Sequence, residues 1–574
     1  MQKRWFIKNN PSDDEVAQLI NDVKVSPLMA RLLYQRELLS FDAITSFFKP
    51  QLEQLHDPFL MLNLREAAEL VKEAIEKQQH IVIFGDYDVD GTTAVALVYS
   101  VLQQYTTVSY YIPDRYEEGY GLSYKGIDTA LERGASLMIA LDCGIKEVEK
   151  VAYAKEKGLP IIVCDHHTPG EMVPDCLVLD PKQDNCTYPF KELCGCGVGF
   201  KLMQGLLHIM GESDVFLLQQ LDLVAIAIGA DIVSLSGENR ILCKLGLKQL
   251  NEQPRIGIQA LVQQAKKVFP LDLSNVVFII APRINAAGRL DSGQRSVALL
   301  LADSEKLARS IAVEIDEYNT NRRLLDTQIT EEALALIAED ELHANRKSTV
   351  VFQSDWHKGV VGIVASRLIE KHYRPTIVLT ESNGVATGSA RSVVGFSVYD
   401  AIESCAHLIT QFGGHQYAAG LTLPLENVPA FREAFDAAVQ DKMQLKDEVE
   451  ELTVDLEIRL SDLFLAGESV HEVPRVFKML AEVEPFGPDN PKPVFVVRSA
   501  YAASHRILKE AHLKLAIYDP ISKVTIPAIG FNLADKVDLV AAGCAFDCAF
   551  TLETNTWNNQ TTLQLQIRDI REGS

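Results

Sequence analysis

The chain has 574 residues, of which 47% are apolar and 23% charged, and it carries a formal net charge of −23. This length and composition indicate a globular protein of several domains without low-complexity tracts. No apolar run approaches the ~20 residues of a membrane-spanning helix, and the N-terminal segment lacks the apolar core of a signal peptide, so we expect a cytoplasmic protein. The acidic balance argues against a uniformly basic nucleic-acid-binding surface, although a local groove can still be positive.

Ten cysteines are spread along the chain without a CxxC pair. The closest spacings are Cys194/Cys196 and Cys544/Cys548. Cys194 and Cys196 can be interpreted as soft metal ligands, but two thiols without further partners are more typical of packing residues. We therefore expect reduced cysteines.

The first half of the chain predicts a helical N-terminal lead-in followed by an α/β domain. Residues 1–75 place apolar residues at helical spacing. In residues 76–299, short apolar runs such as "HIVIFGD", "ASLMIALD" and "LPIIVCD" alternate with helical segments. This alternation is typical of βαβ units and predicts a parallel sheet.

The second half predicts a linker and two further domains. Residues 300–344 have no Pro or Gly and indicate a long helical linker. Residues 345–445 form a second, smaller α/β domain with mixed apolar and glycine-rich segments. In residues 446–574, segments such as "LTVDLEIRL" and "TLQLQIRDI" alternate apolar and polar residues strictly, which predicts an antiparallel β-barrel resembling an OB-fold.

One short segment, "GDYDVDGTTA", contains Asp86, Asp88 and Asp90 at the end of a predicted buried strand. If the extended geometry continues, the three side chains project to the same side. Their charges then repel one another, and a divalent cation such as Mg²⁺ or Mn²⁺ would relieve this repulsion. The alternative is an Asp-rich loop that caps the helix beginning after Gly91.

The same pattern recurs at other predicted strand ends. Asp142 follows a second apolar run, and Asp165, His166 and His167 follow a third. Because the carboxyl ends of parallel strands meet at one edge, we expect these side chains to gather there. Asp231 follows a fourth apolar stretch, where a helix cap is the alternative. Carboxylates with imidazoles suit a pair of Mn²⁺ or Mg²⁺ ions, which indicates hydrolysis of a phosphoester or phosphoanhydride.

The segments "GDYDVDGTTA", "LDCG", "CDHH" and "GADIVSL" occur in this order along the chain. Together they resemble motifs I to IV of the DHH phosphoesterase superfamily. The segments "DWHKGVVGIVASRL", "GSARS" and "FGGHQYAAG" are similar to its DHH-associated domain. "EPFGPDNPKPVF" and the β domain after it resemble the branch that degrades single-stranded DNA from the 5′ end in bacterial repair and recombination.

This resemblance implies a role for each acidic or histidine residue. The candidate metal ligands are Asp86, Asp88, Asp90, Asp142, His166 and Asp231. Among them, Asp86 is expected to support the others through hydrogen bonds, as is Asp165 outside the set. Asp142, His166 and His167 are the candidate catalytic residues, and His167 binds a metal or the scissile phosphate.

Substrate contacts are predicted in two loops of the first α/β domain. In "IPDRYEEGYG", Arg115 can hold a phosphate and Tyr120 can stack on a base; a surface salt bridge and a rim aromatic are the alternatives. In "PRINAAGRLDSG", Arg283, Asn285 and Arg289 lie among small residues that allow close approach of a nucleotide strand.

In the second α/β domain, Ser389 and Arg391 with Gly414 and His415 predict a terminal-phosphate pocket near a helix start. A tight turn and a core histidine are the alternatives. The resemblance implies that this domain selects the 5′ end of the substrate.

Two tryptophans outside this pocket are less informative. Trp356, with His357, is expected to shape the interface between the domains. Trp557 is a conspicuous aromatic residue of the predicted barrel, so the sequence supports an OB-like barrel better than a nucleic-acid grip.

The predicted activity is a two-metal, single-strand-specific 5′ to 3′ exodeoxyribonuclease, with a helicase and a single-strand-binding protein as expected partners and a monomer as the expected state. Two alternatives remain. One is a phosphodiesterase acting on short oligonucleotides, cyclic dinucleotides or pyrophosphate. The other is a catalytically inactive DNA-binding scaffold, against which the intact acidic residues argue.

Overall fold

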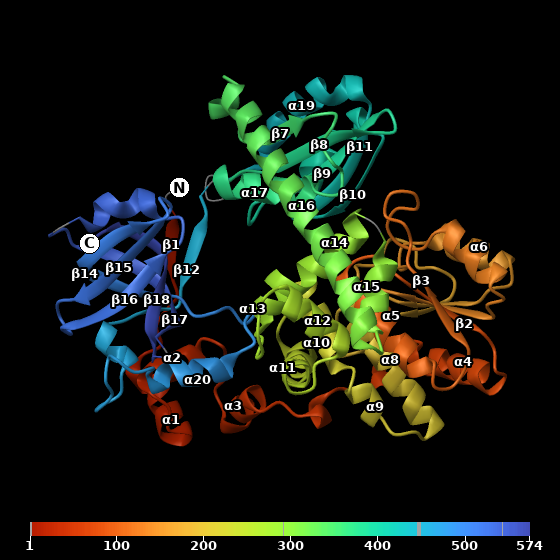
Figure 1. Cartoon of the computed structure of the whole chain (residues 1–574), viewed down its shortest axis with the longest axis horizontal. Helices are drawn as coiled ribbons and strands as arrows, with labels where there is room; N and C mark the ends of the chain where they lie inside the picture. The colour runs from red at the N-terminus through yellow and green to blue at the C-terminus, as the bar shows by residue number, and fades with distance from the viewer. Residues whose placement is uncertain (1–2, 291, 445–448, 542, 559, 574) are drawn as a thin grey trace.

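The structure is a computed structural model that describes residues 3–290, 292–444, 449–541, 543–558 and 560–573. Figure 1 shows a parallel-sheet lobe, a long helix leading to a second lobe, and a barrel beside them. The predicted domain boundary at 445/446 lies outside the described residues. In the described ranges, no helix has both the length and the apolar character needed to cross a membrane.

The first lobe is built on a five-stranded parallel sheet in the order β3-β2-β4-β5-β6, which confirms the predicted parallel sheet. Its strands are β2 (Ile81–Gly85), β3 (Val108–Tyr111), β4 (Leu137–Leu141), β5 (Ile161–Cys164) and β6 (Leu177–Leu179). Alternate residues of β2 enter two different cores, because helices cover both faces of the sheet. Because the five strands are parallel, their carboxyl ends all lie at one edge of the sheet.

Helices cover this sheet and extend it toward the barrel. One face is covered by α4 (Leu64–Glu76), α5 (Val89–Leu102) and α8 (Gly195–Met210), and the other by α6 (Tyr124–Glu132) and α7 (Val148–Glu156). The remaining elements are α9 (Val215–Leu218), α10 (Leu221–Ala230), α11 (Gly237–Glu252), α12 (Ile256–Gln264), α13 (Leu273–Asn275), the π-helix η3 (Val276–Ile280), α14 (Ala281–Leu290) and α15 (Gly293–Leu300).

The predicted helical linker is a single helix, α16 (Glu305–Glu339). It packs on α12, α14 and α15 of the first lobe and, further along, on α17 (Val361–Lys371) of the second lobe. It contains no Gly or Pro, so its hydrogen-bond ladder runs uninterrupted from one lobe to the other.

The second lobe has a mixed five-stranded sheet in the order β10-β11-β9-β8-β7. The elements are β7 (Thr349–Phe352), β8 (Thr376–Ser382), β9 (Val385–Arg391), α18 (Val398–Glu403), β10 (Gln411–His415), β11 (Ala418–Leu423) and α19 (Val428–Lys442). Gly414 and His415 were predicted near a helix start, and this is wrong. They lie on β10, because the segment pairs with β11, with Gly414 opposite Ala419.

The C-terminal domain is a closed five-stranded barrel, as predicted from its alternating pattern. Its strands are β14 (Phe495–Leu508), β15 (His512–Asp519), β16 (Val524–Gly530), β17 (Phe546–Trp557) and β18 (Gln560–Glu572). Pairing of β14 with β17 closes the barrel. The prediction of an antiparallel barrel is wrong at one pairing, because β16 and β18 run parallel to each other. Every second residue of β15 is buried, as expected for a strand with one face toward a core.

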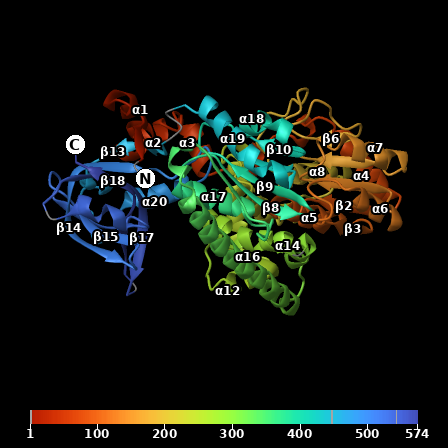
Figure 2. The same cartoon turned by 90° about the horizontal axis from the view of Figure 1, so that it is seen from above.

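The N-terminal segment packs on this barrel, although it is distant in sequence. Strand β1 (Arg4–Ile7) pairs in parallel with β12 (Glu451–Val454), and helices α1 (Asp13–Val23), α2 (Pro27–Tyr34) and α3 (Phe41–Phe48) share the barrel core with α20 (Arg475–Val483). Figure 2 shows α1–α3 beside the barrel strands. The segment expected as one lead-in therefore divides, since α4 belongs to the first lobe.

Candidate metal centre and phosphate pocket

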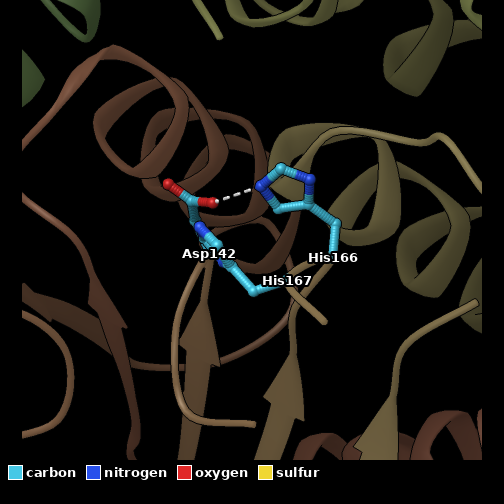
Figure 3. A group of neighbouring side chains, drawn as sticks. All are labelled: Asp142, His166 and His167. Carbon is cyan, nitrogen blue, oxygen red and sulfur yellow. Dashed lines mark ion pairs between the residues drawn. The ribbon is translucent and has the colours of Figure 1, made fainter. Parts of the chain in front are cut away.

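The carboxyl edge of the parallel sheet gathers acidic and imidazole side chains. Asp86 follows β2, Asp142 follows β4, and His166 follows β5. Asp142 has a φ of 61°, an uncommon backbone conformation for a residue with a side chain. Figure 3 shows its carboxylate pointing at the His166 ring, where Oδ1 and Nε2 are 3.2 Å apart.

The three aspartates of the GDYDVDGTTA segment converge by a strand–turn–helix path, not along an extended chain as expected. Asp88 is the N-cap of α5 and accepts a hydrogen bond from the Gly91 amide at 3.1 Å, so the capping alternative also holds. Asp90 lies in the first helical turn. As a result, Asp86 and Asp88 face Asp142, whereas Asp90 turns toward a different group.

Asp231 joins that second group from a helix end. It is the C-cap of α10, and its Oδ2 lies 3.5 Å from His166 Nε2. Asp90 Oδ2 lies 3.7 Å from the same nitrogen. Three clusters therefore have ligand atoms within 4.8 Å of one another: Asp86/Asp88/Asp142, Asp90/His166/Asp231 and Asp142/His166/His167.

The N-terminus of α8 fixes Asp90, a role that our sequence analysis missed. The amides of Gly195 and Cys196 each donate to one Asp90 carboxylate oxygen at 2.7 Å. A side chain at Gly195 would place its Cβ 2.6 Å from Asp142 Oδ1, so only glycine fits. The sequence signal for this role is Gly195, which opens a helix within the "CGCG" segment. Our interpretation of this segment considers only its thiols.

Asp165 occupies a supporting position beneath the histidines. Its Oδ1 accepts hydrogen bonds from the amides of His166 and His167 and from His167 Nδ1, at 2.7, 3.2 and 2.7 Å. Its Oδ2 accepts from the Ile145 amide at 2.9 Å. Asp165 thereby orients both histidines and leaves Nε2 of His167 to other partners.

Several polar atoms at the centre are buried with few partners. Asp142 Oδ1 and His166 Nε2 lie 3.2 Å from each other but form no other polar contact closer than this, and among the described residues neither Asp86 carboxylate oxygen accepts a well-formed hydrogen bond. Buried carboxylates are costly unless they are paired or bind a metal. Carboxylates with one imidazole are a donor set for Mn²⁺ or Mg²⁺, so these residues fit a pair of such ions.

The ionisation of these groups follows from burial and mutual repulsion. Burial, reinforced by neighbouring aspartates, raises the pKa of Asp90 to about 7 and of Asp231 to about 8, and raises the pKa values of Asp86 and Asp142 well above the ordinary range. Burial lowers the pKa of His166 to about 3, which keeps this ring neutral, as a metal ligand must be.

His167 behaves in the opposite way. Burial alone would lower its pKa, but the hydrogen bond and charge of Asp165 outweigh burial and raise the pKa to about 9. Its ring is therefore a cation at neutral pH, beside a neutral His166 ring at a centroid distance of 4.5 Å.

A group of arginines lies next to the acids, at the junction of the two lobes. Burial and the charges of Arg115, Arg322 and Arg391 lower the pKa of Arg289 to about 10. Arg391 donates to Ser389 Oγ at 2.7 Å, and Arg115 lies 4.9 Å over the Tyr87 ring. Within the described residues, Arg115, Arg289 and Arg391 form no ion pair with an acid, so their charges are available to an anion.

Tyr120 and His415 lie on either side of His167. The Tyr120 hydroxyl donates to the Asp142 carbonyl oxygen at 3.2 Å, and its ring meets the His167 ring edge-on at 5.9 Å. The His415 ring is nearly parallel to that of His167, with centroids 6.5 Å apart. Through β10, the second lobe thus reaches the metal centre next to Gly414, which has a φ of 148°.

Of two further predicted substrate residues on α14, Arg283 is occupied by other partners. Arg283 on α14 forms an ion pair with Asp316 of α16 at 2.9 Å and donates to the Ile279 carbonyl oxygen, so its guanidinium joins two helices. Asn285 is half-buried on the same helix. The small residues of this segment let α14 approach the protein itself, since a Cβ on Gly288 would clash with the Tyr87 carbonyl oxygen.

Trp356 and His357 lie where the lobes meet, as expected. The Trp356 indole donates to Glu332 of α16 at 2.7 Å, and the His357 ring meets the Tyr116 ring of the first lobe edge-on. All ten cysteines are free, and Cys194 and Cys196 are buried.

Comparisons with known proteins agree with this architecture. Residues 80–228 match the DHH family, N-terminal domain, residues 345–441 match the DHHA1 domain, and residues 455–569 match the RecJ OB domain. The single-stranded-DNA-specific exonuclease RecJ of Haemophilus influenzae is 32% identical over 95% of this chain and 96% of its own length. The enzyme of the same name from Bacillus subtilis is 36% identical over 99% of this chain and 70% of its own length.

Solved structures give the same result. The crystal structure of RecJ from Thermus thermophilus in complex with Mn²⁺ is similar with a TM-score of 0.84 and 28% identity, over 100% of this chain and 80% of that chain. The Mg²⁺ complex from the same organism is similar with a TM-score of 0.77 and 26% identity, over 100% of this chain and 79% of that chain. The chain therefore belongs to the RecJ family of the DHH superfamily.

Proposed function

We propose that this protein is a metal-dependent exonuclease that hydrolyses single-stranded DNA from its 5′ end to mononucleotides, in DNA repair and recombination. The observation that carries the proposal is the proximity of two sets of charge. Acids gathered around the neutral His166 ring lie near half-buried arginines that form no ion pair with an acid among the described residues, and the charge of Arg115 lowers the pKa of Asp86. Two cations and a terminal phosphate would neutralise both sets at once.

In this proposal, Asp86, Asp88 and Asp142 would hold one ion, and Asp90, His166 and Asp231 would hold the other. Such ions activate water for attack on a phosphorus atom and neutralise charge on the phosphate. The protein supplies the fixed geometry, because backbone amides hold Asp90 and Asp165 orients both histidines. His167, oriented by Asp165 and lying 3.3 Å from the Tyr120 hydroxyl, would bind a metal or the scissile phosphate.

In this proposal, the arginine group selects the 5′ end of the strand, which sets the direction of cleavage. Arg115, Arg289 and Arg391 with Ser389 would bind the 5′ phosphate, and Tyr120 would stack on the first base. With its terminal phosphate held there, the strand would present its first phosphodiester toward the acidic residues, where the His415 ring lies 6.5 Å from that of His167. Cleavage at this bond would release one nucleotide.

The rest of the strand would follow the cleft between the first lobe and the barrel. This cleft has a volume of about 1320 Å³ and includes Phe278 of η3 and Phe531, which are 75% and 51% exposed. Its charged lining is mixed, with Lys244, Lys248, Lys492 and Arg568 beside Asp272, Glu482, Glu484 and Glu553, and Lys492 is paired with Glu553. The exposed aromatics are the feature of this cleft that is typical of single-strand binding. The pocket and cleft belong to one chain, which favours a monomer, and a helicase with a single-strand-binding protein would present the strand.

A nuclease assay tests the proposal against its alternatives. We expect mononucleotide release from 5′-phosphorylated single-stranded DNA with Mn²⁺ or Mg²⁺, and loss of release in an Asp142→Ala variant. Hydrolysis of a dinucleotide or cyclic dinucleotide without attack on the long strand would favour the phosphodiesterase alternative. Strand binding without release by the unmodified protein would favour the scaffold.

A further inference from the structure

The loop after β3, residues 112–121, carries two of the proposed substrate contacts, and three of its side chains connect it to the neighbourhood of the metal centre and the second lobe. Arg115 lies over the Tyr87 ring, and the Tyr120 hydroxyl bonds to the Asp142 carbonyl oxygen. Both of these attachments are made within the first lobe. The third attachment, through Tyr116, reaches the second lobe.

Tyr116 lies in a seam made of three distant segments. Its hydroxyl donates to the Arg289 carbonyl oxygen at the end of α14. Its ring meets the His357 ring edge-on at a centroid distance of 6.0 Å, and Lys358 Nζ lies 4.5 Å from the ring centroid. The Arg289 guanidinium closes the seam by donating to the Gly359 carbonyl oxygen at 2.9 Å.

Gly359 shows how closely these segments fit. A Cβ at this position would collide with the Tyr116 hydroxyl and approach the Arg289 carbonyl oxygen to 2.9 Å. The Gly359 amide donates to His357 Nδ1 at 3.1 Å, which fixes the turn. Gly359 of the second lobe is therefore closely packed against Tyr116 and Arg289 of the first lobe.

The seam lies beside a pocket whose parts repel one another. Arg115 comes from the first lobe and Arg391 from the second. Partial burial lowers the pKa of Arg391, and the charge of Arg115 lowers it further. A bound phosphate would hold the two guanidinium groups together, but before binding only the protein can resist their separation. Tyr116 is the direct neighbour of Arg115 and is tied to the segment that contacts the second lobe.

We propose that Tyr116 is a positioning residue that sets Arg115 against Arg391 and thereby determines the preference for a 5′-phosphate end over a 5′-hydroxyl end. This inference rests on the proposed function, since it assumes that the arginine group binds the terminal phosphate. Two fixed guanidinium groups bind a phosphate better than two mobile ones, because less freedom is lost on binding. A 5′-hydroxyl end has no terminal phosphate, so its binding does not depend on how the two guanidinium groups are fixed.

The test compares two oligonucleotides of identical sequence, one with a 5′ phosphate and one with a 5′ hydroxyl. Their dissociation constants are measured with Ca²⁺, and their hydrolysis with Mn²⁺. In Tyr116→Phe, which keeps the ring and loses the hydroxyl, we expect the preference for the phosphate end to fall about tenfold, with binding of the hydroxyl end unchanged. Tyr153→Phe is the matched control, because this tyrosine also donates one hydrogen bond, to Asp128, on the outside of the same lobe.

A second variant approaches the seam from its other side. Gly359→Ala displaces the Tyr116 hydroxyl and also crowds the Arg289 carbonyl oxygen. The same loss of preference is expected, and it tests the seam as a whole, whereas Tyr116→Phe decides the role of Tyr116. An unchanged preference in Tyr116→Phe overturns the inference. The inference is also overturned if Tyr116→Phe weakens binding of both oligonucleotides equally and lowers the melting temperature, because that result gives Tyr116 a role in stability alone.

The outcomes also separate this inference from the proposed function. If the unmodified protein prefers phosphate ends in binding but releases no nucleotides with Mn²⁺, the exonuclease proposal fails and the binding ratio still tests Tyr116. If the unmodified protein releases nucleotides from both ends equally, the activity stands and the role of Tyr116 is refuted.

Discussion

The metal centre and the arginine pocket are neighbours, but they are built in opposite ways. The acids of the centre come from one lobe, and backbone amides fix Asp90 and Asp165. The arginines of the pocket come from both lobes, and side-chain contacts such as those of Tyr116 hold the lobes together. The centre is therefore a local structure, whereas the pocket depends on how the lobes are arranged.

This difference predicts different consequences of mutation. Changes in the metal centre should abolish the reaction on every substrate. Changes in the pocket should instead alter which strand ends are used. A variant that breaks this rule would show that the two regions are not separate in function.

The largest effect is expected for Asp86→Asn. Both Asp86 oxygens are buried and accept no well-formed hydrogen bond among the described residues, so we infer that they face a cation. Loss of a metal-binding carboxylate should lower activity by several kcal/mol of barrier, or about 10³-fold, on phosphate and hydroxyl ends alike. The control is Asp184→Asn, an exposed aspartate of the same lobe.

Asp86→Asn also distinguishes two roles for Asp86: binding a metal directly, or supporting the other metal ligands through hydrogen bonds. If Asp86 is a ligand, Asp86→Asn should abolish the rise in melting temperature that Mn²⁺ causes. It should not lower the melting temperature in EDTA, because burial raises the pKa of Asp86 well above its ordinary value and disfavours the charged form when no metal is bound. A variant that keeps its Mn²⁺ response but melts earlier in EDTA would assign Asp86 to hydrogen-bonded support.

Arg391→Gln should have a selective effect. A charged hydrogen bond to phosphate contributes about 1.5–3 kcal/mol, so kcat/KM on 5′-phosphorylated strands should fall roughly 10- to 100-fold. Strands with a 5′ hydroxyl should be cut as before. Arg309→Gln, an exposed position on α16 paired with Glu305, serves as the control. Equal losses on both ends would contradict a terminal-phosphate pocket.

Asp165→Asn tests the layer beneath the metal ligands. The amide keeps the size of the carboxylate but loses an acceptor for the Ile145 amide or for the groups of His166 and His167. Outer partners of this kind typically contribute 10- to 100-fold to metal affinity, and we expect a loss in this range for Mn²⁺, measured by calorimetry. Unchanged affinity would show that the histidines are oriented without Asp165.

The smallest effect is a pH dependence of stability without metal. Folded pKa values of about 7 for Asp90, about 8 for Asp231 and about 9 for His167 lie above the unfolded values of 3.8 and 6.5. The folded protein thus binds more protons, so its stability should fall as pH rises from about 6.5 to about 9. Mn²⁺ competes with these protons, and its stabilising effect on the melting temperature should grow over the same range.

If the rise in melting temperature caused by Mn²⁺ did not change with pH over this range, the raised pKa values of Asp90, Asp231 and His167 would be contradicted. The same measurement on Asp142→Ala provides the control, because this variant should show little Mn²⁺ effect at any pH in the range.

Much of the metal centre could be predicted from the sequence, because strand ends follow from periodicity. Asp86, Asp142 and His166 each follow an apolar run, and parallel strands bring such ends together. The path between Asp86 and Asp90 could not be predicted in the same way. An extended chain and a strand–turn–helix both bring the three aspartates close, and only the capping role of Asp88 distinguishes them.

Features that depend on distant partners were not predictable from single segments. Arg283 has the chemistry of a phosphate ligand, but Asp316, which lies far along the chain, occupies its guanidinium. Gly414 lies in a glycine-rich segment that suits a helix start, yet pairing with β11 makes it a strand. The apolar faces of α1–α3 indicated burial without showing that the barrel was their partner.

Anomalous diffraction from crystals grown with Mn²⁺ tests the central claim most directly. We expect two Mn²⁺ ions at the carboxyl edge of the parallel sheet, one bound by Asp86, Asp88 and Asp142 and the other by Asp90, His166 and Asp231. Ions bound away from these side chains, or an edge free of Mn²⁺ at saturating concentration, would contradict the account.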